Sequence, residues 1–451
     1  MMKLSSVAKL FGYSYKEFLV IKNVTIDSRT VSFGSLFIAI KGKNFDGNDY
    51  IKEAIKNGAC AVICEKLDNE IINKKVPQFK VNNTLNALKI LAIYYRKLIS
   101  CKTIGVTGSN GKTTVKEMIS LILPKPSFSS KGNLNNYIGV PISVLSLKFY
   151  HSYAVFELGA SNIGEISYLS KIVKPDISLV TNIAPAHLKG FGNIYNVAKT
   201  KGEIYKSLDL INGVAILNRE EYYSFVWRQF LLNKRILYFS HIRCSDVYAK
   251  NIKMDNYGYT EFTLVLPVGY SNVKLKVPGR HSVINAVAAA ACCYALGISL
   301  FEIVNGLEKF RGVPGRMMFL KGKKDSLIID DTYNANLYSV LVAIDMLCKV
   351  KRRKKILVLG DLCELGCFSK NHHKIIGYIA RYYNISLLFT LGMNTVYSNI
   401  IFYNMNIKRH YICKEKLIYD LFYYLDKDTV ILVKGSRSFF MEDIVQELLI
   451  K

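Results

Sequence analysis

Residues 103–122 read TIGVTGSNGKTTVKEMISLI and combine an apolar run, a glycine-rich turn and a stretch of helical periodicity. The apolar residues Ile104 and Val106 predict a strand, and the later apolar residues, three or four positions apart, predict a helix. Between them, Gly108 and Gly111 let backbone N–H groups approach phosphate oxygens, and the helix N-terminus adds partial positive charge. This stretch therefore predicts a strand, a phosphate-binding loop and a helix.

Two side chains directly after the loop suit a nucleoside triphosphate. Lys112 can reach the terminal phosphates, and the Thr113 hydroxyl can bind Mg²⁺. The strict P-loop pattern has glycine five residues before Gly111, where this chain has Val106. A surface turn with a chance Gly-Lys-Thr is the alternative, but the flanking strand and helix favour a nucleotide site. The predicted nucleotide-binding residues of the loop are Gly108, Ser109, Asn110, Gly111, Lys112, Thr113 and Thr114.

Length and composition predict a folded chain of several domains. A chain of 451 residues is expected to form about three domains, and a hydrophobic content of 50% argues against disorder. The N-terminal residues do not resemble a signal peptide. The most membrane-like run, residues 286–301, is too short to span a bilayer and is predicted to be a buried helix. We therefore expect no membrane insertion.

The chain is strongly basic, with 61 Lys and Arg residues against 34 acidic ones and a formal net charge of +27. The lysines are spread along the chain, and the densest run, KVKRRKK at residues 349–355, precedes an apolar strand and is predicted to be a solvated loop. We attribute the charge to a compositional bias and expect no nucleic-acid partner. Ten cysteines without paired metal-ligand spacing indicate a reducing cytoplasm.

Residues 1–98 predict a small α/β unit. A polar turn precedes the apolar run near residue 36, and a short helical segment ends at Gly58 before another strand. Ser28 and Arg29 lie in that turn, where they could bind a diphosphate through charge-assisted hydrogen bonds. An arginine in a turn can equally be only solvated, so both interpretations stay open for these two residues.

Residues 99–312 contain the phosphate-binding loop and further apolar strands that lead into polar side chains. One strand ends at Glu157, and another segment runs on to His187. Ligands collect beyond the carboxyl ends of strands in a parallel α/β sheet, so these side chains can converge on the loop. Glu157 offers the hard oxygen that Mg²⁺ prefers, whereas His187 is softer. Lys201 follows on a helical stretch, and a lysine there is usually solvated.

Residues 313–451 alternate predicted strands and helices, which indicates a parallel sheet. The first of these strands ends in the pair Asp330 and Asp331, within SLIIDDTYNAN. No Gly-x-Gly-x-x-Gly pattern follows a strand, so a dinucleotide site is not expected. Lys434, Ser436 and Arg437 lie between a strand end and a helix start, and such a cluster suits a carboxylate or a phosphate.

Ten segments together resemble the Mur ligases in order along essentially the whole chain: TGSNGKTT, GNLNNYIGVP, FELGASNIGEI, NIAPAHLKGFG, AKTKGEIY, GRHSVINAVAAA, VPGRM, DDTYNAN, GDLCELG and LVKGSRS. The GKTT loop is shared by the whole superfamily, including folylpolyglutamate synthases. GNLNN with IGVP, DDTYNAN and LVKGSRS favour the branch that joins D-alanyl-D-alanine to UDP-N-acetylmuramoyl-tripeptide.

The resemblance implies an α/β protein of three domains. A central P-loop ATPase with a parallel sheet, residues 99–312, would lie between a UDP-substrate domain, residues 1–98, and a Rossmann-like domain that binds D-alanyl-D-alanine, residues 313–451. ATP would phosphorylate the tripeptide carboxylate, and the amine would attack the acyl phosphate. The resemblance further implies a cytoplasmic, Mg²⁺-dependent enzyme, which we expect to be a monomer. Domain closure is expected, with Gly315 as a candidate hinge position.

The resemblance also assigns roles at the reacting centre. Lys112 and Thr113 would contact phosphate and a first magnesium ion, Glu157 would be a magnesium ligand, and His187 would bind a second magnesium ion. Lys201 matches a lysine that many family members carry as a carbamate, whose oxygens hold the second magnesium. Because burial lowers a lysine pKa, a desolvated Lys201 could supply the neutral amine that carbamylation needs.

The remaining roles concern nucleotide and substrate. The resemblance implies that Asn285 contacts adenine and Arg316 the phosphates, while the ribose contact is either Asp330 or Asp331. The implied substrate residues comprise two UDP contacts, two residues facing the acyl substrate, two from the DDTYNAN segment and three for the dipeptide carboxylate: Ser28, Arg29, Asn135, Asn136, Tyr333, Asn336, Lys434, Ser436 and Arg437. For Asp361 and Glu364, a role in the C-terminal site and a structural role in a turn both stay open.

Two other functions compete with this one. Another ligase of the superfamily would add diaminopimelate, lysine or glutamate, but the Asp-Asn-Pro-Arg run of the diaminopimelate-adding enzyme is absent. A basic P-loop ATPase acting on nucleic acid would need a helicase or strand-binding signature. The single tryptophan and the scattered charge offer none.

Overall fold

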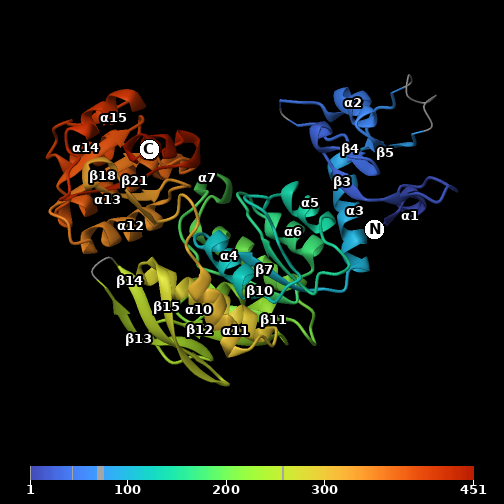
Figure 1. Ribbon diagram of the computed structural model, residues 1–451, viewed down its shortest axis with the longest axis horizontal. Coiled ribbons are helices and arrows are strands. Elements are labelled where there is room, and N and C mark those ends of the chain that lie inside the picture. Colours follow the sequence, from blue (N-terminus) through green and yellow to red (C-terminus); the bar gives the residue numbers. More distant parts are fainter. Residues whose placement is uncertain (1, 43, 69–75, 256–257, 451) are drawn as a thin grey trace.

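The computed structural model describes residues 2–42, 44–68, 76–255 and 258–450. Three main sheets follow one another along the chain, with four, nine and six strands, and helices accompany each of them. The four-stranded and six-stranded sheets lie at opposite ends of the molecule, and the nine-stranded sheet lies between them (Figure 1). This confirms the predicted α/β class. The strands of these sheets fall within residues 23–80, 102–278 and 318–434, inside the three predicted domains.

The first sheet is parallel throughout, in the order β3-β4-β5-β6. Its central strands are almost wholly buried because helices cover it, which explains their continuous apolar sequences. A short antiparallel pair, β1 with β2, precedes it. The elements are β1 (Met2–Lys3), α1 (Leu4–Leu10), β2 (Val20–Ile21), β3 (Asn23–Thr25), β4 (Ser35–Ile38), α2 (Ile51–Lys56), β5 (Ala59–Cys64), β6 (Gln78–Lys80) and α3 (Thr84–Leu98).

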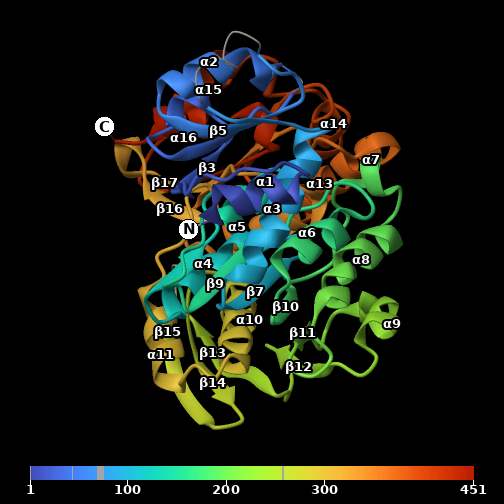
Figure 2. The same ribbon diagram turned by 90° about the vertical axis from the view of Figure 1, so that its right-hand side faces the viewer.

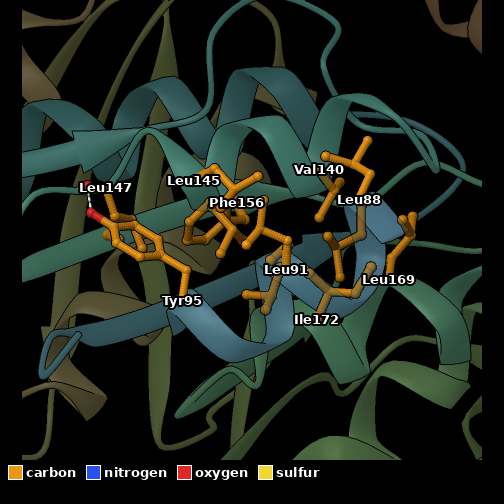
Figure 3. Packing of buried hydrophobic residues seen from close by; sticks show 14 of the residues in the cluster. Leu88, Leu91, Tyr95, Val140, Leu145, Leu147, Phe156, Leu169 and Ile172 are labelled. Atoms are coloured by element: carbon orange, nitrogen blue, oxygen red, sulfur yellow. Dashed lines mark hydrogen bonds between the residues drawn. The ribbon is translucent and has the colours of Figure 1, made fainter. Parts of the chain in front are cut away.

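The helix α3 connects the first sheet to the second. It begins at the cap Asn83, whose side chain accepts a hydrogen bond from the N–H of Asn86. Its apolar face packs on the central unit beside α5 and α6 (Figure 2). Figure 3 shows Leu91 and Tyr95 in this core, with the Tyr95 hydroxyl donating to the carbonyl of Leu147 at 2.7 Å. This packing joins the N-terminal unit to the central unit.

The central sheet has the order β15-β14-β13-β12-β11-β10-β7-β9-β8. The strands from β8 to β13 are parallel, as predicted, whereas β13, β14 and β15 pair antiparallel, which the sequence did not lead us to expect. In β15 buried and exposed residues alternate, the pattern of a sheet covered on one face. The strands are β7 (Lys102–Thr107), β8 (Ser127–Ser129), β9 (Tyr153–Glu157), β10 (Ile177–Val180), β11 (Val214–Asn218), β12 (Arg235–Ser240), β13 (Val247–Met254), β14 (Tyr259–Leu266) and β15 (Gly269–Pro278).

Helices cover both faces of the parallel part of the central sheet. The predicted buried helix exists, but it ends at Ala295, and Gly297 with φ of 85° separates it from the next helix. Within the described residues, no helix is both long and apolar enough to cross a membrane. The helices are α4 (Lys112–Ile122), α5 (Gly139–Leu145), α6 (Glu165–Val173), α7 (Leu188–Phe191), α8 (Ile194–Gly202), α9 (Arg228–Leu231), α10 (Arg280–Ala295) and α11 (Leu300–Lys309).

The third sheet has the order β16-β17-β21-β18-β19-β20 and is parallel except for β16, so the predicted parallel arrangement is largely confirmed. Because β17 and β21 are neighbours, the ends of both strands, Asp331 and Lys434, lie side by side. The elements are β16 (Met318–Lys321), β17 (Leu327–Asp331), α12 (Leu337–Lys349), β18 (Lys354–Gly360), α13 (Ser369–Tyr382), β19 (Leu387–Leu391), α14 (Val396–Phe402), β20 (His410–Tyr411), α15 (Lys414–Phe422), β21 (Thr429–Lys434) and α16 (Glu442–Leu448).

Candidate active site

The phosphate-binding loop lies between β7 and α4, as the sequence predicted. Gly108 has φ of 145° and Gly111 has φ of 79°, conformations that favour glycine. A Cβ on Gly108 would lie 1.9 Å from the hydroxyl of Thr181, and one on Gly111 would lie 2.6 Å from the side-chain oxygen of Asn285. Both glycines are therefore required by conformation and by space. Asn285, the predicted adenine contact, lies against this loop.

Lys112, the first residue of α4, folds back over the loop. Its ammonium group donates to the carbonyls of Gly108 at 2.9 Å and Ser109 at 3.3 Å. Burial lowers the pKa of Lys112, and the nearby carboxylate of Glu157 opposes that shift. In the described part of the chain it forms no ion pair within salt-bridge distance. The hydrogen bonds of its ammonium group within the described residues are therefore to the two loop carbonyls.

Glu157, at the end of β9, is 3% exposed and forms the centre of a hydrogen-bonded group. Its carboxylate accepts from the hydroxyl of Thr113 at 2.7 Å and from the amide of Asn135 at 2.9 Å. Arg316 donates to the same hydroxyl at 2.8 Å. A hydroxyl and a carboxylate this close fit Mg²⁺, which prefers oxygen ligands and keeps several waters. No group of three or more His, Cys, Asp or Glu residues suited to a metal ion occurs among the described residues, so phosphate and water would complete such a site.

His187 and Lys201 lie near this group. His187 precedes α7 with φ of 53°, and its Nδ1 hydrogen-bonds the carboxylate of Glu364. Lys201 is only 1% exposed, and its Nζ lies 5.8 Å from the centre of the Phe191 ring. Burial lowers the pKa of the Lys201 amine well below its usual value, and the charge of Lys112 lowers it further. The usual expectation of a solvated lysine does not hold for Lys201.

A pocket of about 940 Å³ is lined by residues of the N-terminal, central and C-terminal units. It extends from the phosphate-binding loop to Asn86 of α3 and to Tyr333 beyond β17. A volume of this size is sufficient for a substrate larger than a nucleotide phosphate chain. Of the predicted site residues, the pocket is lined by Lys112, Asn135, Asn136, Glu157, His187, Arg316 and Tyr333.

The segment after β17 connects the C-terminal unit to the loop. The amide of Asn336 caps α12 and also donates to the side-chain oxygen of Asn110 at 2.8 Å. The guanidinium of Arg316 lies 4.1 Å from the centre of the Tyr333 ring. Asp330 accepts hydrogen bonds from Thr332 in its own turn. Which acidic residue of the pair contacts ribose stays a prediction.

The three residues of the predicted dipeptide-binding cluster each have partners within the C-terminal unit. Lys434 is 2% exposed, and its ammonium lies 2.6 Å from the carboxylate of Asp331. The hydroxyl of Ser436 accepts from the N–H of Cys363, while the exposed guanidinium of Arg437 pairs with Glu442. The carboxylate-binding role of Lys434, Ser436 and Arg437 stays a prediction.

The predicted UDP contacts lie in the N-terminal unit and are not among the residues that line the pocket. The hydroxyl of Ser28 donates to Glu53 at 2.9 Å and is largely buried. Arg29 pairs with Asp27 at 2.7 Å, and its hydrogen bonds lower the pKa of that carboxyl. Arg29 remains mostly exposed, so the structure leaves its guanidinium accessible to a ligand.

Sequence reasoning missed several supporting residues. Lys116 is 1% exposed and donates to the carbonyl of Ser130 at 2.8 Å, while the Ser130 hydroxyl accepts from the N–H of Glu157. Glu165 accepts from the N–H of Ser161 at 2.7 Å and shapes the wall of the pocket. The spacing of Lys116 four residues after Lys112, on one helix face, was the available signal.

Comparisons with known proteins agree with this arrangement. The family models described as "Mur ligase family, catalytic domain", "Mur ligase middle domain" and "Mur ligase, glutamate ligase domain" match residues 20–96, 106–293 and 315–437. The UDP-N-acetylmuramoyl-tripeptide–D-alanyl-D-alanine ligase of Haemophilus influenzae is 38% identical, over 99% of this chain and 99% of its own. The ligase of the same name from Escherichia coli is 38% identical, over 94% and 93%.

Solved structures agree as well. MurF from Acinetobacter baumannii superposes with a TM-score of 0.89 at 33% identity, covering 98% of each chain. MurF ligase from Thermotoga maritima, solved in complex with ADP, has a TM-score of 0.82 at 28% identity and covers 96% of this chain and 98% of its own. With the relatives and the family models, these likenesses extend over nearly the whole chain, and the chain therefore belongs to the Mur ligase family.

Proposed function

We propose that this chain is an ATP-dependent ligase that joins D-alanyl-D-alanine to UDP-N-acetylmuramoyl-tripeptide, the last step in assembling the peptidoglycan peptide in the cytoplasm. The observation that carries the proposal is the pocket that joins the phosphate-binding loop to residues of both flanking units. Relatives of that name match the chain over almost its full length. We expect it to act as a monomer.

The reaction forms an amide in two steps. An oxygen of the tripeptide carboxylate attacks the γ-phosphorus of ATP, and the bond to ADP breaks. The amine of D-alanyl-D-alanine then attacks the acyl carbon, phosphate leaves, and the amine loses a proton. Such transfers depend on positioning and charge neutralisation more than on a protein nucleophile. Lys112 and Arg316 supply positive charge beside the loop.

Thr113 and Glu157 would hold Mg²⁺, which neutralises the phosphate charge when bound. His187 and a carbamate on Lys201 would hold a second ion. Carbamylation forms a bond between a neutral amine nitrogen and CO₂ and releases a proton. The burial of Lys201 and its lowered pKa support this part of the proposal.

The remaining proposed contacts to substrate and nucleotide are distributed over the three units. Ser28 and Arg29 would contact UDP in residues 1–98, and Asn135 and Asn136 would face the acyl group. Asn285 would contact adenine in residues 99–312. Residues 313–451 would supply the ribose contact, the substrate contacts and the dipeptide ligands: Asp330 or Asp331, Tyr333, Asn336, Lys434, Ser436 and Arg437.

The test is phosphate release from ATP in the presence of Mg²⁺. Release should require both UDP-N-acetylmuramoyl-tripeptide and D-alanyl-D-alanine, and DNA should not stimulate it. Mass spectrometry of the product should show the pentapeptide nucleotide. Release that accepts diaminopimelate, lysine or glutamate in place of the dipeptide would assign the chain to another activity of the superfamily.

A further inference from the structure

Glu364, in the loop after β18, makes a two-point contact with the central unit. Its carboxylate hydrogen-bonds Nδ1 of His187, and its backbone carbonyl accepts from the N–H of Lys189 at 3.0 Å. Glu364 has φ of 61° and His187 has φ of 53°, so both residues adopt left-handed conformations at the contact. Glu364 is thus joined to the central unit at two residues, through its side chain to His187, 177 positions away, and through its backbone to Lys189.

This contact determines which ring nitrogen of His187 remains available. Nδ1 is engaged by Glu364, and the Ser161 hydroxyl lies 3.4 Å from the same nitrogen. Nε2 forms no hydrogen bond within the described residues, and His187 lines the pocket. A carboxylate at one nitrogen fixes the proton there and leaves the lone pair of the other free for a ligand.

The contact also forms only when the C-terminal unit lies against the central unit. Two more hydrogen bonds join the C-terminal unit to the central unit. Arg316 donates to Thr113 at the start of α4, and Asn336 donates to Asn110 in the phosphate-binding loop, each at 2.8 Å. The side chain of Glu364 is 55% exposed, so its pair with His187 is a solvated one that can form and break at low cost.

We propose that Glu364 is a positioning residue that orients His187 and makes completion of the nucleotide and metal site depend on docking of the C-terminal unit. This rests on the proposed function, because it gives His187 its role there. An enzyme built in this way assembles the full site only after the unit that brings the amine has docked, which protects an acyl phosphate from water.

The test compares Glu364→Gln with Glu447→Gln, a matched change of an exposed carboxylate on α16 of the same unit. In the protein without metal or nucleotide, hydrogen exchange of residues 187–191 should become faster by up to about 5-fold in Glu364→Gln, because the docked C-terminal unit loses a solvated pair worth at most about 1 kcal/mol. Affinity for Mn²⁺ in the presence of a non-hydrolysable ATP analogue, and kcat for phosphate release, should each fall by about 10 to 100-fold. Glu364→Asp should recover part of the Mn²⁺ affinity and part of kcat. Glu447→Gln should match the wild type in all three measurements.

Unchanged exchange and unchanged Mn²⁺ affinity in Glu364→Gln would overturn the proposal, as would equal effects in Glu447→Gln. Loss of activity with both of these readouts unchanged would also overturn it. Exchange and Mn²⁺ binding need no acceptor substrate, so they still test Glu364 if the chain proves to act on a different acceptor.

Discussion

Two buried lysines in different units have opposite surroundings. Lys434 of the C-terminal unit is 2% exposed and lies 2.6 Å from the carboxylate of Asp331, with the carbonyl of Asn334 at 3.0 Å. Lys201 of the central unit is 1% exposed, faces the Phe191 ring and forms no hydrogen bond among the described residues. A buried charge without a partner costs free energy, whereas a paired one is neutralised within the fold. From this contrast we predict a chemical role for Lys201 and a structural role for Lys434.

The buried carboxylates of Asp361 and Glu157 also differ in their hydrogen-bond partners. Asp361 accepts hydrogen bonds from the backbone and amide of Asn394 and from the N–H of Thr395, which close a turn of the C-terminal unit. Glu157 instead binds the side chains of Thr113 and Asn135 at the edge of the pocket. Water, metal or substrate can displace side-chain donors more easily than a closed backbone turn. These contacts favour the structural interpretation of Asp361.

The largest expected effect is at Lys201. Lys201→Met should lower turnover by about 10³-fold, because the amine that we propose to be carbamylated is lost. The same change should raise the free energy of unfolding by about 1 kcal/mol or more, since an unpaired buried amine is replaced by an apolar group. Phosphate release and urea unfolding measure the two effects. Lys199→Met, on the exposed face of α8, is the control. Normal turnover in Lys201→Met would show that Lys201 has no role in the reaction.

Lys112 comes next. Lys112→Met should lower phosphate release by about 10²-fold, because the positive charge over the loop is removed. Binding of a fluorescent ADP analogue should weaken as well. Since the Lys112 ammonium hydrogen-bonds only the carbonyls of Gly108 and Ser109, thermal unfolding should change little. A variant that unfolds but keeps its activity per folded molecule would contradict the assignment of Lys112 to the reaction.

Lys434 tests the structural side of the comparison. Lys434→Met removes the ion-pair partner of the largely buried Asp331 carboxylate, which then keeps only the hydrogen bond from the N–H of Met317, and should cost about 3 kcal/mol of stability. The double variant Lys434→Met with Asp331→Asn should recover most of that loss in urea unfolding. Lys427→Met, an exposed lysine of the same unit, is the control. A stable Lys434→Met enzyme with a raised KM for D-alanyl-D-alanine alone would instead favour the predicted role in binding the dipeptide carboxylate.

The smallest effect is expected at a surface pair. The ammonium of Lys354 and the hydroxyl of Thr429 lower the pKa of Asp426 from 3.8 to about 2. Because the folded pKa is the lower one, the stabilisation is present above the unfolded value and is lost as the pH falls through about 2. Both side chains are 40% exposed or more, so Asp426→Asn should cost at most about 1 kcal/mol.

Urea unfolding of wild type and Asp426→Asn at about pH 7 and about pH 3 measures the difference, which should shrink at the lower pH. The neighbouring Asp428→Asn, whose carboxylate forms no ion pair in the described chain, is the control. A difference that grows on acidification would show that the Asp426 pair does not stabilise the folded state in this way.

Local patterns were sufficient for much of the fold and for one part of the site. The phosphate-binding loop could be predicted because its glycines, its lysine and the following helical periodicity are neighbours in sequence. The positions of Glu157 and His187 at the pocket could be predicted because Glu157 ends one apolar strand and His187 lies in the segment after another. The antiparallel extension β13 to β15 was missed, since pairing direction depends on which strands meet in space rather than on any one strand.

The sequence by itself thus determined the α/β class, the position of the phosphate-binding loop and, through its motifs, the family. Only the tertiary structure decided which charges are paired, because the partners lie far apart along the chain. Lys434 and Asp331 are separated by 103 positions, and Glu364 and His187 by 177. Burial and pairing are properties of packed surfaces, and residue type alone predicted that Lys201 would be solvated. The physical reason is that the free energy of a charge depends on its surroundings, which only the folded chain supplies.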